Sequence, residues 1–200
     1  MILKQIPSGY DQNFAYLIAD ENTKEAVIID PSTDLSIIKE EIKGFKIKYI
    51  INTHSHEDHI AGNEELKSLT HAKIVQHELS PGQHDISVKD NQEIKIGEIN
   101  LKFIYTPGHI KDHICILAED KLFTGDLLFV GTIGGVGSRF KGSNLEEEYD
   151  SLQRIAKFPD NTEIYPGHDY GSKPKSTIKY EKETNVFLLC KTFEEFQNLT

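Results

Sequence analysis

The feature that most constrains this chain is a strand followed at once by a run of metal-ligating side chains. Residues 46–52 read Lys-Ile-Lys-Tyr-Ile-Ile-Asn, which predicts a strand, and residues 53–59 read Thr-His-Ser-His-Glu-Asp-His. Three imidazoles and a carboxylate therefore follow the carboxyl end of a strand, where open sheets commonly place their ligands. Imidazole and carboxylate groups suit zinc, iron and manganese. The run predicts a metal site at one edge of a sheet.

Three other segments place a candidate ligand in the same position after a strand. Each consists of an apolar strand, a turn containing glycine, and a final His or Asp; they are Ile104–His109, Leu122–Asp126 and Ile164–His168. Taken singly, each final residue could be a turn former or a helix cap. Strand ends can direct several loops at one point, so the four segments together predict a shared centre that holds at least one transition-metal ion, and two if all the ligands are used.

The rest of the chain alternates short strands with helices. Expected strands are 2–6, 13–19, 26–30, 46–52, 73–76, 92–96, 99–105, 113–118, 121–124 and 163–165. Expected helices are 34–43, 61–69, 145–157, 176–184 and 192–198. Two groups of strands with helices outside each predict an α+β fold, a four-layer αββα sandwich. We expect a single domain over residues 1–200, with a short C-terminal helical tail from about 174 to 200.

Charge and composition bear mainly on partners and location. The net charge of −10 repels phosphate backbones and anionic lipid, so neither nucleic acid nor a membrane is expected as a partner. The apolar run at residues 1–7 is too short for a signal peptide, and no stretch approaches the ~20 apolar residues of a membrane span. Cys115 and Cys190 each follow apolar residues, which predicts buried, reduced thiols and a cytoplasmic protein.

The run 53–59, taken with His109, Asp126 and His168, resembles the motifs of the metallo-β-lactamase superfamily, in particular its glyoxalase II and persulfide dioxygenase branches. The resemblance covers almost the whole chain and implies the αββα fold with the site at one edge of the sandwich. It also implies two divalent ions, Zn(II) or Fe(II), with Mn(II) as a further candidate. The implied ligands are His54, His56 and His109 for the first ion, Asp58, His59 and His168 for the second, and Asp126 as the bridge between them.

Two reactions fit this ligand set. In the first, a glyoxalase II-like (hydroxyacylglutathione hydrolase-like) metallo-hydrolase lowers the pKa of a bridging water towards ~7, and the metal-bound hydroxide, oriented by Asp58, attacks a thioester or related ester. In the second, a single Fe(II) held by the counterparts of His54, His109 and Asp126 oxidises glutathione persulfide with dioxygen. A third hypothesis is a non-catalytic metal-binding protein, although structural zinc sites are usually four-coordinate and rich in cysteine.

The expected partner is a small-molecule substrate, a glutathione or other thiol conjugate, and the resemblance also implies a homodimer. Arg139 and Lys141 are candidates to bind a substrate carboxylate, or are solvated loop cations. Tyr170, just after His168, is a candidate to contact the substrate or to pack. His113 is a candidate for an outer position behind the metal ligands, or is exposed. Three further histidines in polar segments are expected at the surface: His71, His77 and His84.

Overall fold

A computed structural model describes residues 1–200 and contains two mixed six-stranded sheets. The first sheet has the strand order β1 (Ile2–Pro7), β2 (Phe14–Ala19), β3 (Glu25–Ile29), β4 (Lys46–Ile51), β5 (Lys73–His77) and β6 (Ile86–Val88). The second has the order β12 (Ser176–Thr177), β11 (Glu163–Pro166), β10 (Lys121–Gly125), β9 (Ile114–Ala118), β8 (Ile99–Tyr105) and β7 (Glu93–Ile96).

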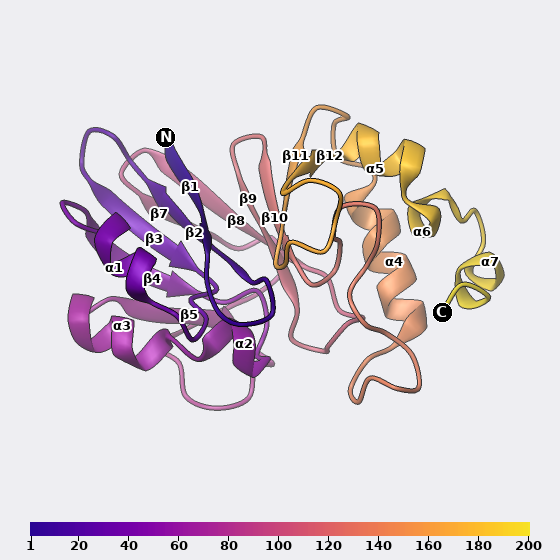
Figure 1. The fold of residues 1–200 in the computed structure, drawn as a ribbon, viewed down its shortest axis with the longest axis horizontal. Coiled ribbons are helices and arrows are strands. Elements are labelled where there is room, and N and C mark those ends of the chain that lie inside the picture. Colours follow the sequence, from indigo (N-terminus) through magenta and orange to yellow (C-terminus); the bar gives the residue numbers. More distant parts are fainter.

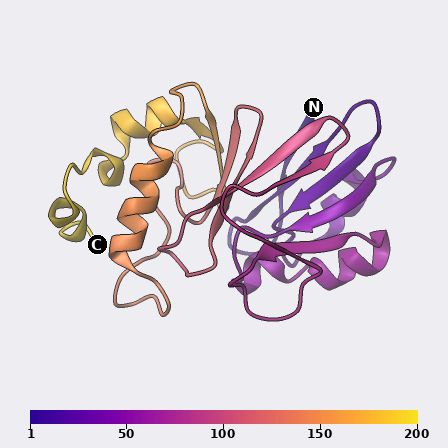
Figure 2. The ribbon, with the colours of Figure 1, turned by 180° about the vertical axis from the view of Figure 1, so that it is seen from behind.

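Helices cover the outer face of each sheet, so the layers follow the order helix, sheet, sheet, helix (Figure 1, Figure 2). The first sheet is covered by α1 (Ser36–Glu41) and α3 (Asn63–Thr70), which follows the single turn α2 (Glu57–Ile60). The second is flanked by α4 (Leu145–Ile155), α5 (Ile178–Thr184), α6 (Val186–Leu189) and α7 (Phe193–Gln197). The expected αββα sandwich is confirmed. None of these helices has the length and apolar character needed to cross a membrane.

Strand β2 is apolar throughout because both of its faces are buried. Successive side chains of a strand point to opposite faces of the sheet. Tyr16 and Ile18 therefore enter the core between the two sheets, while Leu17 and Ala19 enter a second core beneath α1. Both sets of side chains are almost fully buried, which explains the continuous hydrophobic run in the sequence.

The direction of the strands brings the ligand-bearing loops to one edge. Strands β3 to β6 are parallel to one another, and so are β10 and β11. Strand β8 pairs antiparallel with β9, which in turn pairs antiparallel with β10, so β8 and β10 run the same way. The carboxyl ends of strands that run in the same direction lie at the same edge of a sheet. The segments that follow β4, β8, β10 and β11 therefore meet.

Most expected elements agree with the structure within two residues at each end, and the differences involve short elements. Helices α2 and α6 and strands β6 and β12 were not expected, since each has only two to four residues and too little periodicity to recognise. One prediction about a side chain was wrong. His77 is buried, because its ring stacks on Tyr105 with centroids 4.3 Å apart.

Candidate metal centre

Seven histidine and aspartate side chains from the four strand ends converge at one place. Their ligand atoms form three overlapping groups, in each of which the atoms lie within 4.8 Å of one another. The groups are His54, His56 and His109; Asp58, His59 and His168; and His54, His59 and Asp126. The fold thus brings all the sequence-predicted ligands together. Below, the first group is His54, His56 and His109, and the second group is Asp58, His59 and His168.

Distances within the groups suit coordination of an ion. In the first group, Nδ1 of His56 lies 3.0 Å from Nε2 of His54 and 3.0 Å from Nε2 of His109. In the second, Nε2 of His168 lies 3.2 Å from Nε2 of His59 and 3.3 Å from Oδ2 of Asp58. Tetrahedral ligands ~2.1 Å from zinc are separated by about 3.4 Å. The residues present therefore fit a metal in each group.

Asp126 lies between the two groups and faces both. Its Oδ1 atom is 3.3 Å from Nε2 of His59 and 3.4 Å from Nε2 of His168. Its Oδ2 atom is 3.6 Å from Nε2 of His109, which belongs to the first group. Oδ1 is buried and has no hydrogen-bond donor. A buried carboxylate oxygen requires a partner, and a cation held by the second group, beside which Oδ1 lies, would satisfy this requirement.

The outer nitrogens of His109 and His168 fix which ring nitrogen faces the centre. Nδ1 of His109 donates to the main-chain oxygen of Gly135 at 2.8 Å, and Nδ1 of His168 donates to that of Asp11 at 2.7 Å. A carbonyl oxygen can only accept, so the proton of each neutral ring is on Nδ1. When such a ring is neutral, as metal binding requires, its Nε2 lone pair points inward, which is the arrangement found in metal-ligating histidines.

Asp30, which was not among the predicted site residues, fixes two other histidines. Its carboxylate accepts hydrogen bonds from the main-chain N–H of Thr53 and from the Thr53 hydroxyl, both at 2.7 Å, and its Oδ2 lies 3.1 Å from Nδ1 of His59. The Thr53 hydroxyl is also 3.0 Å from Nδ1 of His54. The sequence contained a signal for Asp30, because it ends the apolar run 26–30 in the same position as the predicted ligands.

Burial and charge set the protonation states at the centre. Burial lowers the pKa of His54 and of His109, which favours the neutral rings that a metal needs. Burial opposes ionisation of Asp126, but the neighbouring imidazoles of His59 and His168 outweigh it and hold the pKa of Asp126 well below its usual range. Asp126 is therefore an ionised carboxylate.

His113 lies directly behind Asp126 and is fully buried. Its Nε2 accepts a hydrogen bond from the main-chain N–H of Asp126 at 3.2 Å, and its Nδ1 is 3.0 Å from the hydroxyl of Thr106. Burial lowers the pKa of His113 to about 3, so the ring is neutral and can accept. The geometry corresponds to the outer position considered for His113 rather than to an exposed side chain.

The three candidate substrate-binding residues differ in their surroundings. Arg139 and Lys141 are exposed, and neither forms a hydrogen bond or ion pair with the seven converging residues. Tyr170 is 42% exposed, and its ring stacks on His168 with centroids 4.7 Å apart and planes 15° apart. Its hydroxyl donates to the carboxylate of Asp11 at 2.6 Å. Packing against His168 is therefore an observed role of Tyr170, whereas contact with a substrate stays a prediction for all three.

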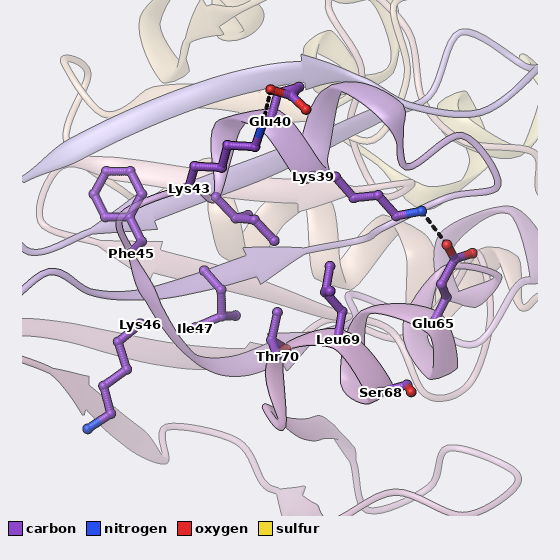
Figure 3. Close-up of a pocket in the computed structure, with 11 residues that line it drawn as sticks. Lys39, Glu40, Lys43, Phe45, Lys46, Ile47, Glu65, Ser68, Leu69 and Thr70 are labelled. Carbon is purple, nitrogen blue, oxygen red and sulfur yellow. Dashed lines mark hydrogen bonds and ion pairs between the residues drawn. The ribbon is translucent and has the colours of Figure 1, made fainter.

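A separate groove of about 1020 Å³ lies between α1, α3 and the start of β4. Its floor includes Phe45 and Ile47, and lysine–glutamate pairs such as Lys39–Glu65 lie on its rim (Figure 3). None of the seven converging residues lines it. The groove is therefore distinct from the metal centre.

Comparisons with known proteins agree with this geometry. A family model described as the metallo-beta-lactamase superfamily matches residues 8–168. The chain is 33% identical over 198 residues to a probable polyketide biosynthesis zinc-dependent hydrolase, BaeB, of Bacillus velezensis, covering 93% of this chain and 86% of that protein. It is 33% identical over 233 residues to the hydroxyacylglutathione hydrolase of Pelagibacter ubique, covering 98% and 96%. The crystal structure of ETHE1 from Myxococcus xanthus superposes with a TM-score of 0.92 and 32% identity, covering 100% of this chain and 89% of that one.

Proposed function

Since the chain belongs to the metallo-β-lactamase superfamily, we propose that it is a glyoxalase II-like hydrolase that binds two divalent cations and cleaves a thioester. The observation that carries the proposal is the position of Asp126, whose two carboxylate oxygens face different groups of ligands. Relatives named hydroxyacylglutathione hydrolase support a thioester of glutathione, or of another small thiol, as the substrate.

The first group would hold one cation and the second group the other, with Asp126 between them. A relative named as a zinc-dependent hydrolase supports zinc, and the N/O ligand set also suits Fe(II) or Mn(II). When bound, such a pair supplies a nucleophile at neutral pH and polarises the carbonyl of the substrate.

The chain's own contribution centres on Asp58. This side chain is 21% exposed, so it reaches the open side of the centre. Burial opposes its ionisation, but the neighbouring imidazoles of His168 and His59 and the hydrogen bond from Asn13 outweigh burial and hold the pKa of Asp58 far below its usual range. An ionised carboxylate can only accept hydrogen bonds. Asp58 would therefore orient an attacking water by accepting a hydrogen bond from it, and a thiolate leaves without a strong general acid.

The persulfide dioxygenase reaction is the alternative. It would use a single Fe(II) held by His54, His109 and Asp126. In favour of this possibility, Oδ2 of Asp126 lies 3.6 Å from Nε2 of His109, so two imidazoles and one carboxylate do meet on the side of the first group. Such a set leaves positions open for dioxygen and a sulfur substrate.

Four finer statements belong to the same proposal: the location, the kind of partner, the domain organisation and the oligomeric state. The two free, buried cysteines support a reducing, cytoplasmic location. The net charge of −10 supports a small-molecule partner rather than nucleic acid or a membrane. Packing of α7 and α5 into the same apolar cluster as α4 supports a single domain with a helical tail. A homodimer is proposed from the family resemblance.

Metal analysis combined with two assays tests the proposal. The purified protein is expected to contain about two metals per chain, to hydrolyse a glutathione thioester, and to consume no oxygen when given glutathione persulfide. One iron per chain with oxygen uptake would instead establish the alternative. A protein that carries its metals and is inert in both assays would contradict both.

A matched pair of variants ties the reaction to the centre. His54→Ala should remove a metal and reduce turnover by more than the ~10–100-fold that loss of an outer hydrogen bond causes. His71→Ala removes an exposed histidine at the C-terminal end of α3, outside the ligand groups, and should keep the metal content and turnover of the unaltered protein. Normal turnover and metal content in His54→Ala would refute the ligand assignment.

A further inference from the structure

The loop of residues 8–13, which connects β1 to β2, lies against the second group of ligands. Asn13 is 2% exposed, and its Nδ2 donates to Oδ2 of Asp58 at 2.9 Å and lies 3.3 Å from the main-chain oxygen of Asp58. Its Oδ1 accepts from the main-chain N–H of Asp11 at 3.3 Å, which orients the amide so that its donor faces Asp58. The amide of Asn13 therefore fixes the position of that carboxylate.

The same loop also holds the other end of the second group. The main-chain oxygen of Asp11 accepts from Nδ1 of His168, and Asn13 forms an isolated β-bridge with His168. The main-chain oxygen of Gln12 accepts from the N–H of Asp169 at 2.9 Å. Figure 1 shows this indigo loop beside the orange segment that follows β11. Two of the three members of the second group thus take their positions from one loop.

Other parts of the chain orient the side chains of the first group. His109 is held by the main-chain oxygen of Gly135, and His54 by the hydroxyl of Thr53. The loop of residues 8–13 forms no hydrogen bond with either residue. Apart from histidines of the centre, Asn13 is the only side chain that hydrogen-bonds to the carboxylate of Asp58. Loss of the Asn13 amide should therefore weaken metal binding by the second group more than metal binding by the first group.

We propose that Asn13 is a positioning residue that sets the affinity of the second group for its metal, and thereby decides whether the protein carries two metals or one. The inference rests on the proposed function, because it assumes that each group binds a cation. Its physical basis is that an outer hydrogen bond holds a ligating carboxylate in one orientation. Without it, Asp58 loses its fixed position, whereas the first group keeps all of its supports.

Titration of metal-free protein with Zn(II) by calorimetry, together with elemental analysis after dialysis, tests the proposal. In Asn13→Ala the second of two binding steps should weaken by ~10–100-fold, while the first step stays unchanged. Asn13→Leu should give the same split, since leucine has the same number and branching of side-chain heavy atoms but no donor. Elemental analysis should then find about one metal per chain in place of about two.

Asp20→Ala is the matched control. Asp20 is 5% exposed and accepts from the main-chain N–H groups of Asn22 and Thr23, at 3.0 and 2.7 Å, at the opposite end of β2. Its replacement should lower stability and leave both binding steps intact. An unchanged second step in both Asn13 variants, or an equal weakening of both steps, would overturn the inference. Absence of two binding steps in the unaltered protein would instead contradict the proposed function.

Discussion

Nδ1 of His59 lies 3.1 Å from Oδ2 of Asp30, and both side chains are almost completely buried. The same carboxylate accepts two hydrogen bonds from Thr53, whose hydroxyl contacts His54. One buried acid therefore orients a histidine of each metal group. The backbone of Asp30 has φ 49°, in the left-handed region that aspartate and asparagine tolerate better than most residues.

Asp30→Asn should keep this backbone conformation but lose acceptor capacity, because its amide nitrogen cannot accept from Thr53 or His59. We expect the free energy of unfolding of the metal-free protein to fall by ~1.5–3 kcal/mol, the usual contribution of a hydrogen bond to a charged group. Metal content should fall as well. Urea unfolding and elemental analysis measure the two effects. Asp34→Asn, at an exposed position, is the control, and equal behaviour of the two variants would contradict the role of Asp30.

His113→Phe should weaken the centre through the backbone of Asp126. The substitution fills the buried space with another ring, but leaves the N–H of Asp126 without its acceptor. An unsatisfied buried donor costs ~1–3 kcal/mol, so the free energy of unfolding should fall by that amount and both metals should bind more weakly. Thermal unfolding with and without Zn(II) gives both quantities. Leu69→Phe, at a residue 55% exposed, should change neither. Unaltered metal affinity in His113→Phe would show that Asp126 does not need this support.

Stability should depend on pH through the pair Lys67–Asp85. Asp85 accepts from Lys67 at 2.7 Å and from the main-chain N–H of Ile74 at 2.8 Å, and these bonds lower the pKa of Asp85. Since the folded pKa lies below the unfolded value near ~3.9, the pair stabilises the fold above that pH and the contribution is lost as the pH falls through the folded pKa. The charges are partly exposed, so Asp85→Asn should cost only about 1 kcal/mol at pH 7.

Urea unfolding of the unaltered protein and Asp85→Asn across this range measures the effect. The difference between them should be constant near neutrality and shrink below about pH 4. A difference that grows on acidification would have the wrong sign. Asp150→Asn, at an exposed carboxylate that forms no ion pair, is the control and should change the free energy of unfolding little.

Phe196→Ala tests whether the C-terminal helices belong to the same folding unit as the sheets. Phe196 is 0% exposed and packs with Leu152 and Ile155 of α4. Truncation of a buried phenylalanine costs ~3–5 kcal/mol, so one cooperative transition should shift by that amount. Leu199→Ala, at a residue 49% exposed, should have little effect. Separate melting of the tail, with the main transition unchanged, would divide the chain into two units.

The fold was predictable because its signals are local. A continuous apolar run such as residues 26–30 indicates a strand buried on both faces, and an alternating run indicates a strand buried on one face. Apolar residues at helical spacing indicate the helix at residues 145–157. Elements of two to four residues, including α2 within the histidine run, were missed, since so few residues carry no period. The burial of His77 was missed for a related reason: its partner Tyr105 lies on a different sheet and is remote in the sequence.

The sequence by itself determined which side chains could bind metal, because ligand chemistry belongs to the residue and the position after a strand belongs to its immediate neighbours. Only the tertiary structure decided how those ligands are divided into two groups, that Asp126 faces both, and that Asn13 and Asp30 hold them in place. Such partners are tens of residues apart, and their contacts depend on how two sheet edges pack together. No local pattern of residues contains that packing.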